Sequence, residues 1–210
     1  MCPLLNNRAV EFFDTQFQRQ AAAGDYSFNP FERAILPFLS GDVLDLGCGL
    51  GNLAITAATM GCRVTALDAS PTAIADLARR AAEQHLAVTP READLRNFTV
   101  EGQFDCVVAI GLLMFFNPEA ARQGLSHIKQ LVRPGGVAAV NVLIEGTTFL
   151  GMFDPGEYYL FSENEVPEFF GGWAQEYLNF ESFPAPENTI KRFCTLVARR
   201  PIEPEGNLKL

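Results

Sequence analysis

The chain has 210 residues, of which 48% are hydrophobic, and a formal net charge of -9. This length suits one α/β domain spanning residues 1–210, and 18 phenylalanines are ample for a core. Because binding to DNA or RNA needs clustered Lys and Arg, the acidity argues against a nucleic-acid partner. No apolar stretch is long enough to span a membrane and no signal-peptide pattern is present, so we expect a cytoplasmic protein.

Five cysteines are spread along the chain: Cys2, Cys48, Cys62, Cys106 and Cys194. Their number is odd, and neither a C-x-x-C pair nor a metal-ligand spacing occurs. Several lie in apolar runs, where Cys behaves as a small hydrophobic residue. The pattern predicts buried free thiols in a reducing compartment and no metal site.

Two helices are expected before the first strand. Residues 8–23 place Val10, Phe13 and Phe17 at helical spacing, and Gly24 ends the helix. A proline at position 30 fits the start of a second helix that runs to residue 39. We expect residues 1–40 to form a helical lid beside the main fold.

Strands and helices alternate in the next part of the chain. The expected strands are 43–47, 63–68, 88–93, 104–109 and 137–143, and the expected helices are 51–60, 71–84 and 118–132. A turn is expected at 133–136, where the sequence reads Arg-Pro-Gly-Gly. Alternation of this kind predicts a doubly wound, Rossmann-like α/β fold with a mostly parallel sheet, seven-stranded once the C-terminal strands are included.

The C-terminal part departs from this alternation. A Gly-rich loop and a short helix precede two β-like runs that are joined by a Pro-rich turn, which predicts an antiparallel pair at one edge of the sheet. These segments are the loop 145–159, the helix 163–170 and the strands 174–183 and 190–198. We assign residues 41–143 to a cofactor-binding core, 144–200 to the substrate side and 201–210 to a tail.

The first strand runs into three alternating glycines, Gly47, Gly49 and Gly51. Glycine lets a ligand approach the backbone closely, and the helix that follows offers unpaired N–H groups. Asp68 ends the second strand, where a carboxylate accepts hydrogen bonds from ribose hydroxyls. The pattern predicts a pocket for a nucleoside-bearing cofactor. The structural alternatives are a tight turn for the glycines and a helix-initiating role for Asp68.

The arrangement D-x-G-x-G-x-G resembles motif I of the class I S-adenosylmethionine-dependent methyltransferases. A dinucleotide site would carry a glycine in place of Asn52 and would lack Asp45, which disfavours a nicotinamide-dependent oxidoreductase. The resemblance implies that Asp45 meets the cofactor amino group and Asp68 the ribose. It also implies that Asp94 and the residue after it meet the adenine, although a solvated loop acid is the alternative for Asp94. The expected cofactor-binding residues are Asp45, Gly47, Cys48, Gly49, Gly51, Asn52, Asp68, Ala69, Asp94, Leu95 and Ile110.

Ligands of open α/β sheets bind beyond the carboxyl ends of the strands, so residues 110–116 are expected to form the floor between cofactor and substrate. Their apolar side chains suit attack on a sulfonium methyl, with core packing as the alternative role. No Ser-His-Asp triad stands out, and methyl transfer to a soft nucleophile needs no general base. Catalytic residues therefore stay unassigned. The expected substrate-pocket residues are Tyr26, Phe31, Met114, Phe115 and Arg192.

Three segments also resemble the tellurite-resistance methyltransferases, which methylate tellurium and selenium oxyanions: 110–116 (IGLLMFF), 159–173 (YLFSENEV, then FF and W) and 191–200 (KRFCTLVARR). The family's His-Arg pair is missing before the last strand, which leaves only Lys191 and Arg192 to attract an anion. Adjacent side chains of a strand point to opposite faces, so one of the two at most reaches the pocket. We expect a monomer or homodimer that methylates a small molecule. A chalcogen-oxyanion methyltransferase and a non-catalytic S-adenosylmethionine-binding domain are the alternatives.

Overall fold

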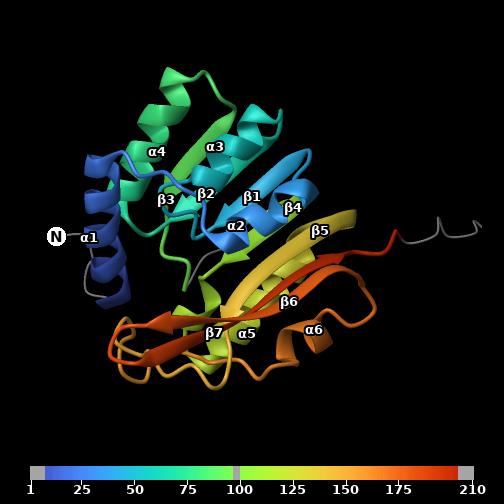
Figure 1. The fold of residues 1–210 in the computed structure, drawn as a ribbon. Helices are drawn as coiled ribbons and strands as arrows, with labels where there is room; N and C mark the ends of the chain where they lie inside the picture. The colour runs from blue at the N-terminus through green and yellow to red at the C-terminus, as the bar shows by residue number, and fades with distance from the viewer. Residues whose placement is uncertain (1–7, 97–99, 203–210) are drawn as a thin grey trace, which may run out of the picture.

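A computed structural model describes residues 8–96 and 100–202 (Figure 1). Cys2 and most of the predicted tail lie outside the described residues. The strands are β1 (Asp42–Leu46), β2 (Arg63–Asp68), β3 (Val88–Glu92), β4 (Phe104–Ile110), β5 (Val132–Leu143), β6 (Ala174–Ala185) and β7 (Thr189–Arg199). The helices are α1 (Arg8–Ala23), α2 (Pro30–Ile35), α3 (Asn52–Thr59), α4 (Pro71–Glu83), α5 (Pro118–Leu131) and α6 (Glu165–Phe169), with 3₁₀ turns at Leu36–Phe38 and Leu113–Phe115.

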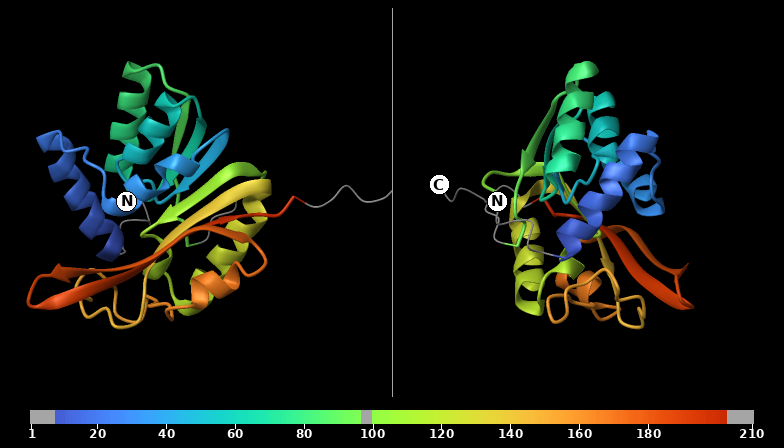
Figure 2. Two further views of the ribbon diagram at one scale, coloured as in Figure 1. Left: turned by 45° about the vertical axis from the view of Figure 1, so that its right-hand side comes forward. Right: turned by 90° about the vertical axis from the view of Figure 1, so that its left-hand side faces the viewer.

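These strands form one seven-stranded sheet in the order β3-β2-β1-β4-β5-β7-β6. Strands β3, β2, β1, β4 and β5 run parallel to one another, while β7 runs antiparallel to both β5 and β6. Figure 2 shows the β6–β7 hairpin extending beyond the central strands. The predicted fold class, with its antiparallel pair at the C-terminal edge, is confirmed.

Helices α2, α4 and α5 begin with the same local signal. A cap side chain, from Asn29, Ser70 or Asn117, accepts a backbone N–H of the first turn and is followed directly by a proline. The cap satisfies an otherwise unpaired donor, and the proline has no N–H to leave unpaired. Among the described helices, none combines the length and the apolar character needed to cross a bilayer.

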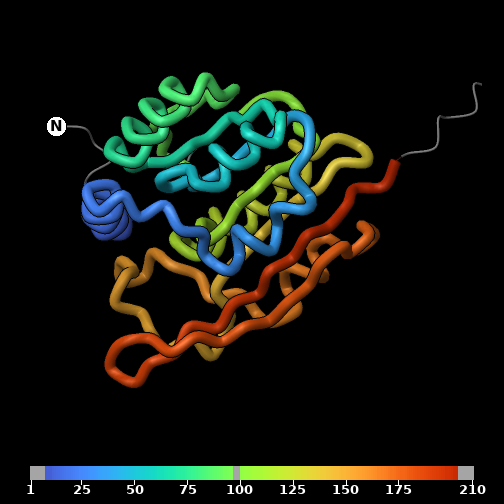
Figure 3. Tube along the Cα trace, turned by 45° about the horizontal axis from the view of Figure 1, so that its top comes forward, coloured from blue at the N-terminus to red at the C-terminus, as the bar shows by residue number. Residues whose placement is uncertain are grey.

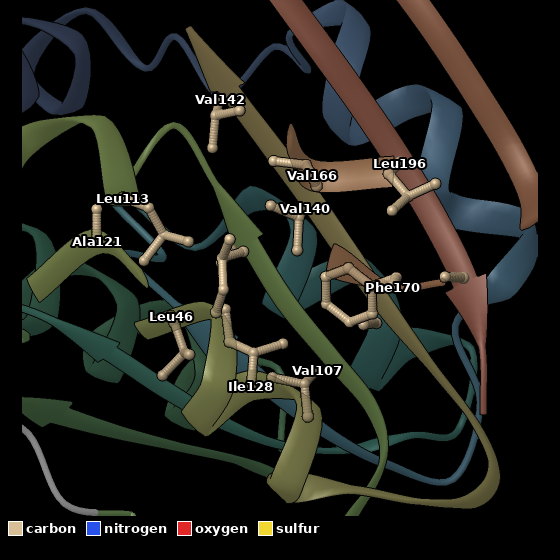
Figure 4. Packing of buried hydrophobic residues seen from close by; sticks show 14 of the residues in the cluster. Leu46, Val107, Leu113, Ala121, Ile128, Val140, Val142, Val166, Phe170 and Leu196 are labelled. Carbon is tan, nitrogen blue, oxygen red and sulfur yellow. The ribbon is translucent and has the colours of Figure 1, made fainter. Parts of the chain in front are cut away.

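Alternate residues of the central strands point into two apolar layers. On one face, α5 and α6 cover side chains such as Leu46, Val107 and Val140, with Phe170 packed among them (Figure 4). On the other face, α2, α3 and α4 cover a second cluster that includes Val43. Burial on both faces explains why the parallel strands read as almost continuous apolar runs.

Helix α1 stands beside the sheet, against α4 and the glycine-rich loop (Figure 3). Its buried Asp14 accepts a hydrogen bond from Ser70 Oγ at 2.5 Å and one from the Thr72 backbone N–H at 3.3 Å. Both donors lie at the start of α4, where unpaired N–H groups and the helix dipole favour a carboxylate. This contact fixes α1 against the main fold.

Two local predictions need correction. The expected turn at 133–136 lies inside β5 as an irregularity of the strand, because the register against β4 shifts between the pairs Phe104–Val132 and Cys106–Val137. Within it, Gly135 donates a backbone hydrogen bond to Arg200, and Arg200 donates one to Gly136, so the segment also pairs with the chain beyond β7. The helix expected to run to residue 39 becomes a 3₁₀ turn, because Pro37 has no N–H to continue the α-helical hydrogen bonds.

Candidate active site

A cavity of about 450 Å³ lies at the carboxyl ends of the central parallel strands, between them and helices α1 and α2. Its wall carries Asp45 from β1, the final residue Asp68 of β2, and Ile110 from the end of β4. This is the edge at which open α/β sheets bind ligands, and the volume suits a small molecule or cofactor. The wall includes every residue that the sequence predicted to bind the cofactor.

The glycine-rich loop needs its glycines for backbone conformation and for packing. Gly47, Gly49 and Gly51 all have positive φ angles, of 72°, 51° and 70°. A Cβ atom on Gly51 would lie 2.5 Å from the side chain of Leu77, and one on Gly49 would lie 3.0 Å from the ring of Phe17. Residues with a Cβ avoid this region of φ, so the tight turn requires glycine at these positions. The same three glycines line the cavity, where their backbone is open to a ligand.

The Asp68 carboxylate holds the loop together. One oxygen accepts the Gly49 N–H and the other accepts the Ser70 N–H, both at 2.8 Å. Burial raises the pKa of Asp68, and these N–H groups act in the opposite direction. The residue therefore has the helix-initiating contact considered as an alternative, and it also lines the cavity.

Two acids of the wall face the same region. Asp45 is buried, and its Oδ2 has no hydrogen-bond partner among the described residues. Burial, with the charges of Glu32 and Asp68, raises the pKa of Asp45 to about 8. Glu32 is held by a reciprocal cap, in which Glu32 and Asn29 each accept the backbone N–H of the other. This pair of acids suits a cationic group in the cavity.

The third acid of the predicted cofactor set is already paired. Arg96 binds both oxygens of Asp94, at 2.9 and 2.6 Å, and lowers the pKa of Asp94. Leu95 is buried between them and lines the same part of the cavity. The sequence analysis missed Arg96, and its position two residues after a strand-end acid was the available signal.

Helix α1 contributes a wall that the sequence analysis also missed. Phe13, Gln16, Phe17 and Gln20 line the cavity, and the ring of Phe13 packs against that of Phe115 at 5.2 Å. The aromatic spacing predicted a helix with one apolar stripe. It gave no indication that this stripe would face a cavity rather than the core.

The predicted substrate residues divide into two groups. Phe31, Met114 and Phe115 line the cavity. Tyr26 lies outside the cavity wall, and its ring stacks under the Arg80 guanidinium at 4.0 Å. Arg192 also lies outside the wall, and its guanidinium donates to Glu145 O at 2.9 Å and to a Glu163 oxygen at 3.0 Å.

Lys191, not Arg192, is the β7 cation on the cavity wall. Lys191 lines the cavity, and its Nζ lies 4.6 Å from the centre of the Phe149 ring. The alternation of side chains along a strand predicted that only one of the two cations could reach the pocket. The choice between Lys191 and Arg192 depended on the register of β7, which the sequence does not contain.

Residues 43–136 match the methyltransferase domain family. The probable S-adenosylmethionine-dependent methyltransferase TehB of Haemophilus influenzae is 27% identical over 167 residues, which cover 75% of this chain and 57% of TehB. This chain therefore spans little more than half the length of that relative. TehB belongs to the tellurite-resistance methyltransferases that the C-terminal segments resemble, so the predicted resemblance is confirmed.

Two solved structures share the fold. The crystal structure of TehB from Haemophilus influenzae superposes with a TM-score of 0.72 at 21% identity, covering 86% of this chain and 66% of TehB. The N-methyltransferase NodS from Bradyrhizobium japonicum, in complex with S-adenosylhomocysteine, gives a TM-score of 0.65 at 19% identity, with coverage of 90% and 98%. Residues 43–136 thus match the methyltransferase domain family, whose cofactor is S-adenosylmethionine, and the chain has the fold of the class I methyltransferases.

Proposed function

We propose that this protein transfers the methyl group of S-adenosylmethionine to a small-molecule acceptor. The observation that carries the proposal is the buried Asp45 carboxylate, whose Oδ2 lacks a partner in the described part of the chain. Such a group is unfavourable unless a cation or donor meets it. The ammonium group of S-adenosylmethionine fits this position, and the charge of Glu32 adds to the attraction.

The other acids of the wall have separate tasks in this proposal. Asp68 uses one lone pair of each oxygen for Gly49 and Ser70, and the remaining lone pairs would accept the ribose hydroxyls. Asp94, held in place by Arg96, would accept a hydrogen bond from the adenine amino group.

The chemistry requires little beyond binding and alignment. When bound, S-adenosylmethionine supplies a methyl group that is activated by positively charged sulfur. The apolar side chains of Ile110, Met114 and Phe115 line the cavity and would exclude water from the reacting centre. Holding the acceptor in line with the methyl would supply much of the acceleration, and a soft nucleophile needs no general base.

Two alternatives remain distinct proposals. A chalcogen-oxyanion acceptor would have to be recognised by Lys191, because the other cation on the cavity wall, Arg96, is paired with Asp94. One unpaired cation beside many apolar groups favours an organic acceptor more. A non-catalytic S-adenosylmethionine-binding domain would use the same acids without an acceptor. The four described cysteines are free and buried, which supports the expected reducing, cytoplasmic location.

The test is methyl transfer from labelled S-adenosylmethionine to a panel of tellurite, selenite, small thiols, phenols and amines. We expect transfer to an organic acceptor and weak or no transfer to tellurite. Binding of S-adenosylhomocysteine without transfer to any member would favour the non-catalytic alternative. Tellurite as the best acceptor would favour the chalcogen alternative.

A further inference from the structure

One face of the β5–β7 pair forms a continuous strip of cavity wall. The antiparallel register pairs Asn141 with Thr195 and Leu143 with Phe193, and directly paired residues project to the same face. Lys191 lies two residues from Phe193 on β7, so it projects to this face too. Asn141, Leu143, Phe193 and Lys191 all line the cavity.

Asn141 occupies the inner end of the strip, opposite Ile110 of β4. Its side chain is fully buried, and its amide nitrogen donates to Thr195 Oγ1 at 2.8 Å. The amide oxygen has no partner among the residues that the structure describes. Because a buried acceptor without a hydrogen bond is unfavourable, this end of the strip suits a ligand with a hydrogen-bond donor. Ile110 belongs to the proposed cofactor wall, so that donor would lie beside the reacting methyl.

The middle of the strip is apolar and aromatic. The Phe31 ring lies 4.5 Å from that of Phe193, and the Phe183 ring lies 5.9 Å from that of Phe193. Met114, Leu143 and the loop residue Met152 are buried in the same region of the wall. Rings in edge or tilted contact at these distances favour an apolar or aromatic ligand body.

Lys191 occupies the outer end. It lies four positions before Thr195 on β7, which is about 13 Å along the strand at about 3.3 Å per residue. Lys191 forms no ion pair with a described residue, and its ammonium lies against Phe149. Burial lowers the pKa of Lys191. Arg192, by contrast, is paired with Glu163 outside the cavity. A partly desolvated ammonium without a carboxylate suits an anionic ligand group.

We infer that the methyl acceptor is an elongated, amphipathic molecule with three parts. A hydroxyl, thiol or amine receives the methyl beside Asn141, an apolar or aromatic body lies along the strip, and an anionic group such as a carboxylate meets Lys191. The inference rests on the proposed function, because it names the acceptor class of the same cavity. A lone pair of the acceptor atom forms the bond to the methyl carbon, the carbon–sulfur bond breaks with its electron pair left on sulfur, and the acceptor proton is released to bulk water when the product leaves.

The test uses three acids with different acceptor atoms, hydroxyphenylacetate, mercaptophenylacetate and aminophenylacetate, each beside its methyl ester, which lacks the negative charge. Each pair is assayed with the wild type, Lys191→Gln and Arg192→Gln. The two substitutions remove the same charge from adjacent residues, and only Lys191 lines the cavity. S-adenosylhomocysteine affinity, measured on all three proteins, controls for folding and for the cofactor site.

For at least one acceptor atom we expect kcat/KM for the acid to exceed that for its ester by about tenfold, the effect of one charge-assisted contact. The ratio should fall to near one in Lys191→Gln and persist in Arg192→Gln. Equal use of acid and ester, or a preference that survives in Lys191→Gln, would overturn the inference while leaving methyl transfer intact.

A binding measurement decides the case in which none of the six compounds is methylated. The acids are then titrated into the S-adenosylhomocysteine complex of each protein. Tighter binding of an acid than of its ester, lost in Lys191→Gln alone, supports the inference even though the proposed activity has not been seen. Failure of every acid to bind better than its ester overturns it.

Discussion

The two halves of the cavity differ in how the chain builds them. The half that we propose for the cofactor comes from short, contiguous segments at the ends of β1 and β2, where Asp68 accepts hydrogen bonds from the glycine loop and from Ser70. The half that we propose for the acceptor comes from α1, α2, the loop after β5 and the β7 strand, which are far apart in sequence. A motif can therefore identify the first half, whereas the second depends on register and packing.

We also expect substitutions in the two halves to differ in their effects on stability and binding. The cofactor half holds its acids at a rigid turn, where small changes disturb both stability and binding. The acceptor half is lined mostly by side chains on separate elements, where substitutions change specificity more than folding. Each variant below tests this contrast, beginning with the largest expected effect.

Gly51→Ala should be the most damaging change. It places a Cβ 2.5 Å from Leu77 at a φ of 70°, so a conformational cost of about 1–2 kcal/mol adds to an overpacking cost of about 1–3 kcal/mol. Gly24→Ala is the matched control, because Gly24 has a φ of 65° and no atom within 4 Å of the added Cβ. Chemical denaturation should show the larger loss for Gly51→Ala. Equal losses would mean that packing of the loop on α4 contributes nothing.

Asp45→Asn should weaken S-adenosylhomocysteine binding by about 1.5–3 kcal/mol, the worth of a hydrogen bond to a charged group. The pKa of Asp45 is raised to about 8, so its contribution to the free energy of unfolding is complete below its ordinary value of 3.8 and is lost as pH rises through 8. The wild type should therefore lose stability over this range more steeply than Asp45→Asn. Binding of an ammonium group favours the charged carboxylate, so wild-type affinity should increase from pH 6 to pH 8.

Calorimetry across this pH range checks both statements about Asp45. Glu163→Gln is a suitable control, because Glu163 is exposed and lies outside the cavity wall. Identical pH profiles for the wild type and Asp45→Asn would show that Asp45 does not meet the cofactor amino group.

Asp68→Asn should reduce cofactor affinity by on the order of 1.5–3 kcal/mol if the carboxylate binds the ribose. It should also lower stability, because the neutral amide leaves one of the Gly49 and Ser70 N–H groups with an uncharged acceptor and the other facing an NH2 donor. Comparison of S-adenosylhomocysteine with homocysteine, which has no ribose, separates the two effects. A loss of stability with unchanged affinity for S-adenosylhomocysteine would leave Asp68 with the helix-initiating role alone.

Tyr26→Phe should have the smallest effect. The Tyr26 hydroxyl donates to Asp76 at 3.2 Å and lies outside the cavity, so we expect kcat/KM within about twofold of the wild type, the scatter of a surface substitution. Steady-state assays with the best acceptor of the panel check this. A tenfold loss of kcat/KM would support the prediction from the sequence that Tyr26 belongs to the substrate pocket.

The sequence predicted the parts of the molecule that local chemistry determines. Capped helix starts and the alternation of apolar strands with helices identified the sheet and nearly every element. The D-x-G-x-G-x-G spacing identified the glycine loop. The turn predicted at 133–136 lies as an irregularity within β5, because backbone pairing with Arg200, distant in sequence, extends the strand across it.

Several residues of the site could not be predicted, because their positions depend on contacts between segments that are distant in sequence. Glu32 and Phe17 reach the cavity only because α1 and α2 dock beside the glycine loop, and Arg96 is notable only once it is seen to bind Asp94. The choice between Lys191 and Arg192 follows from the β5–β7 register. These relations involve segments that no local pattern connects.

The most direct test of the central claim is calorimetric titration of the wild-type protein with S-adenosylhomocysteine, with NAD(H) as the competing dinucleotide. We expect one site with a dissociation constant in the micromolar range, about -7 to -8 kcal/mol, and no binding of NAD(H). Well-folded protein that shows no binding of S-adenosylhomocysteine, or that binds NAD(H) instead, would contradict it.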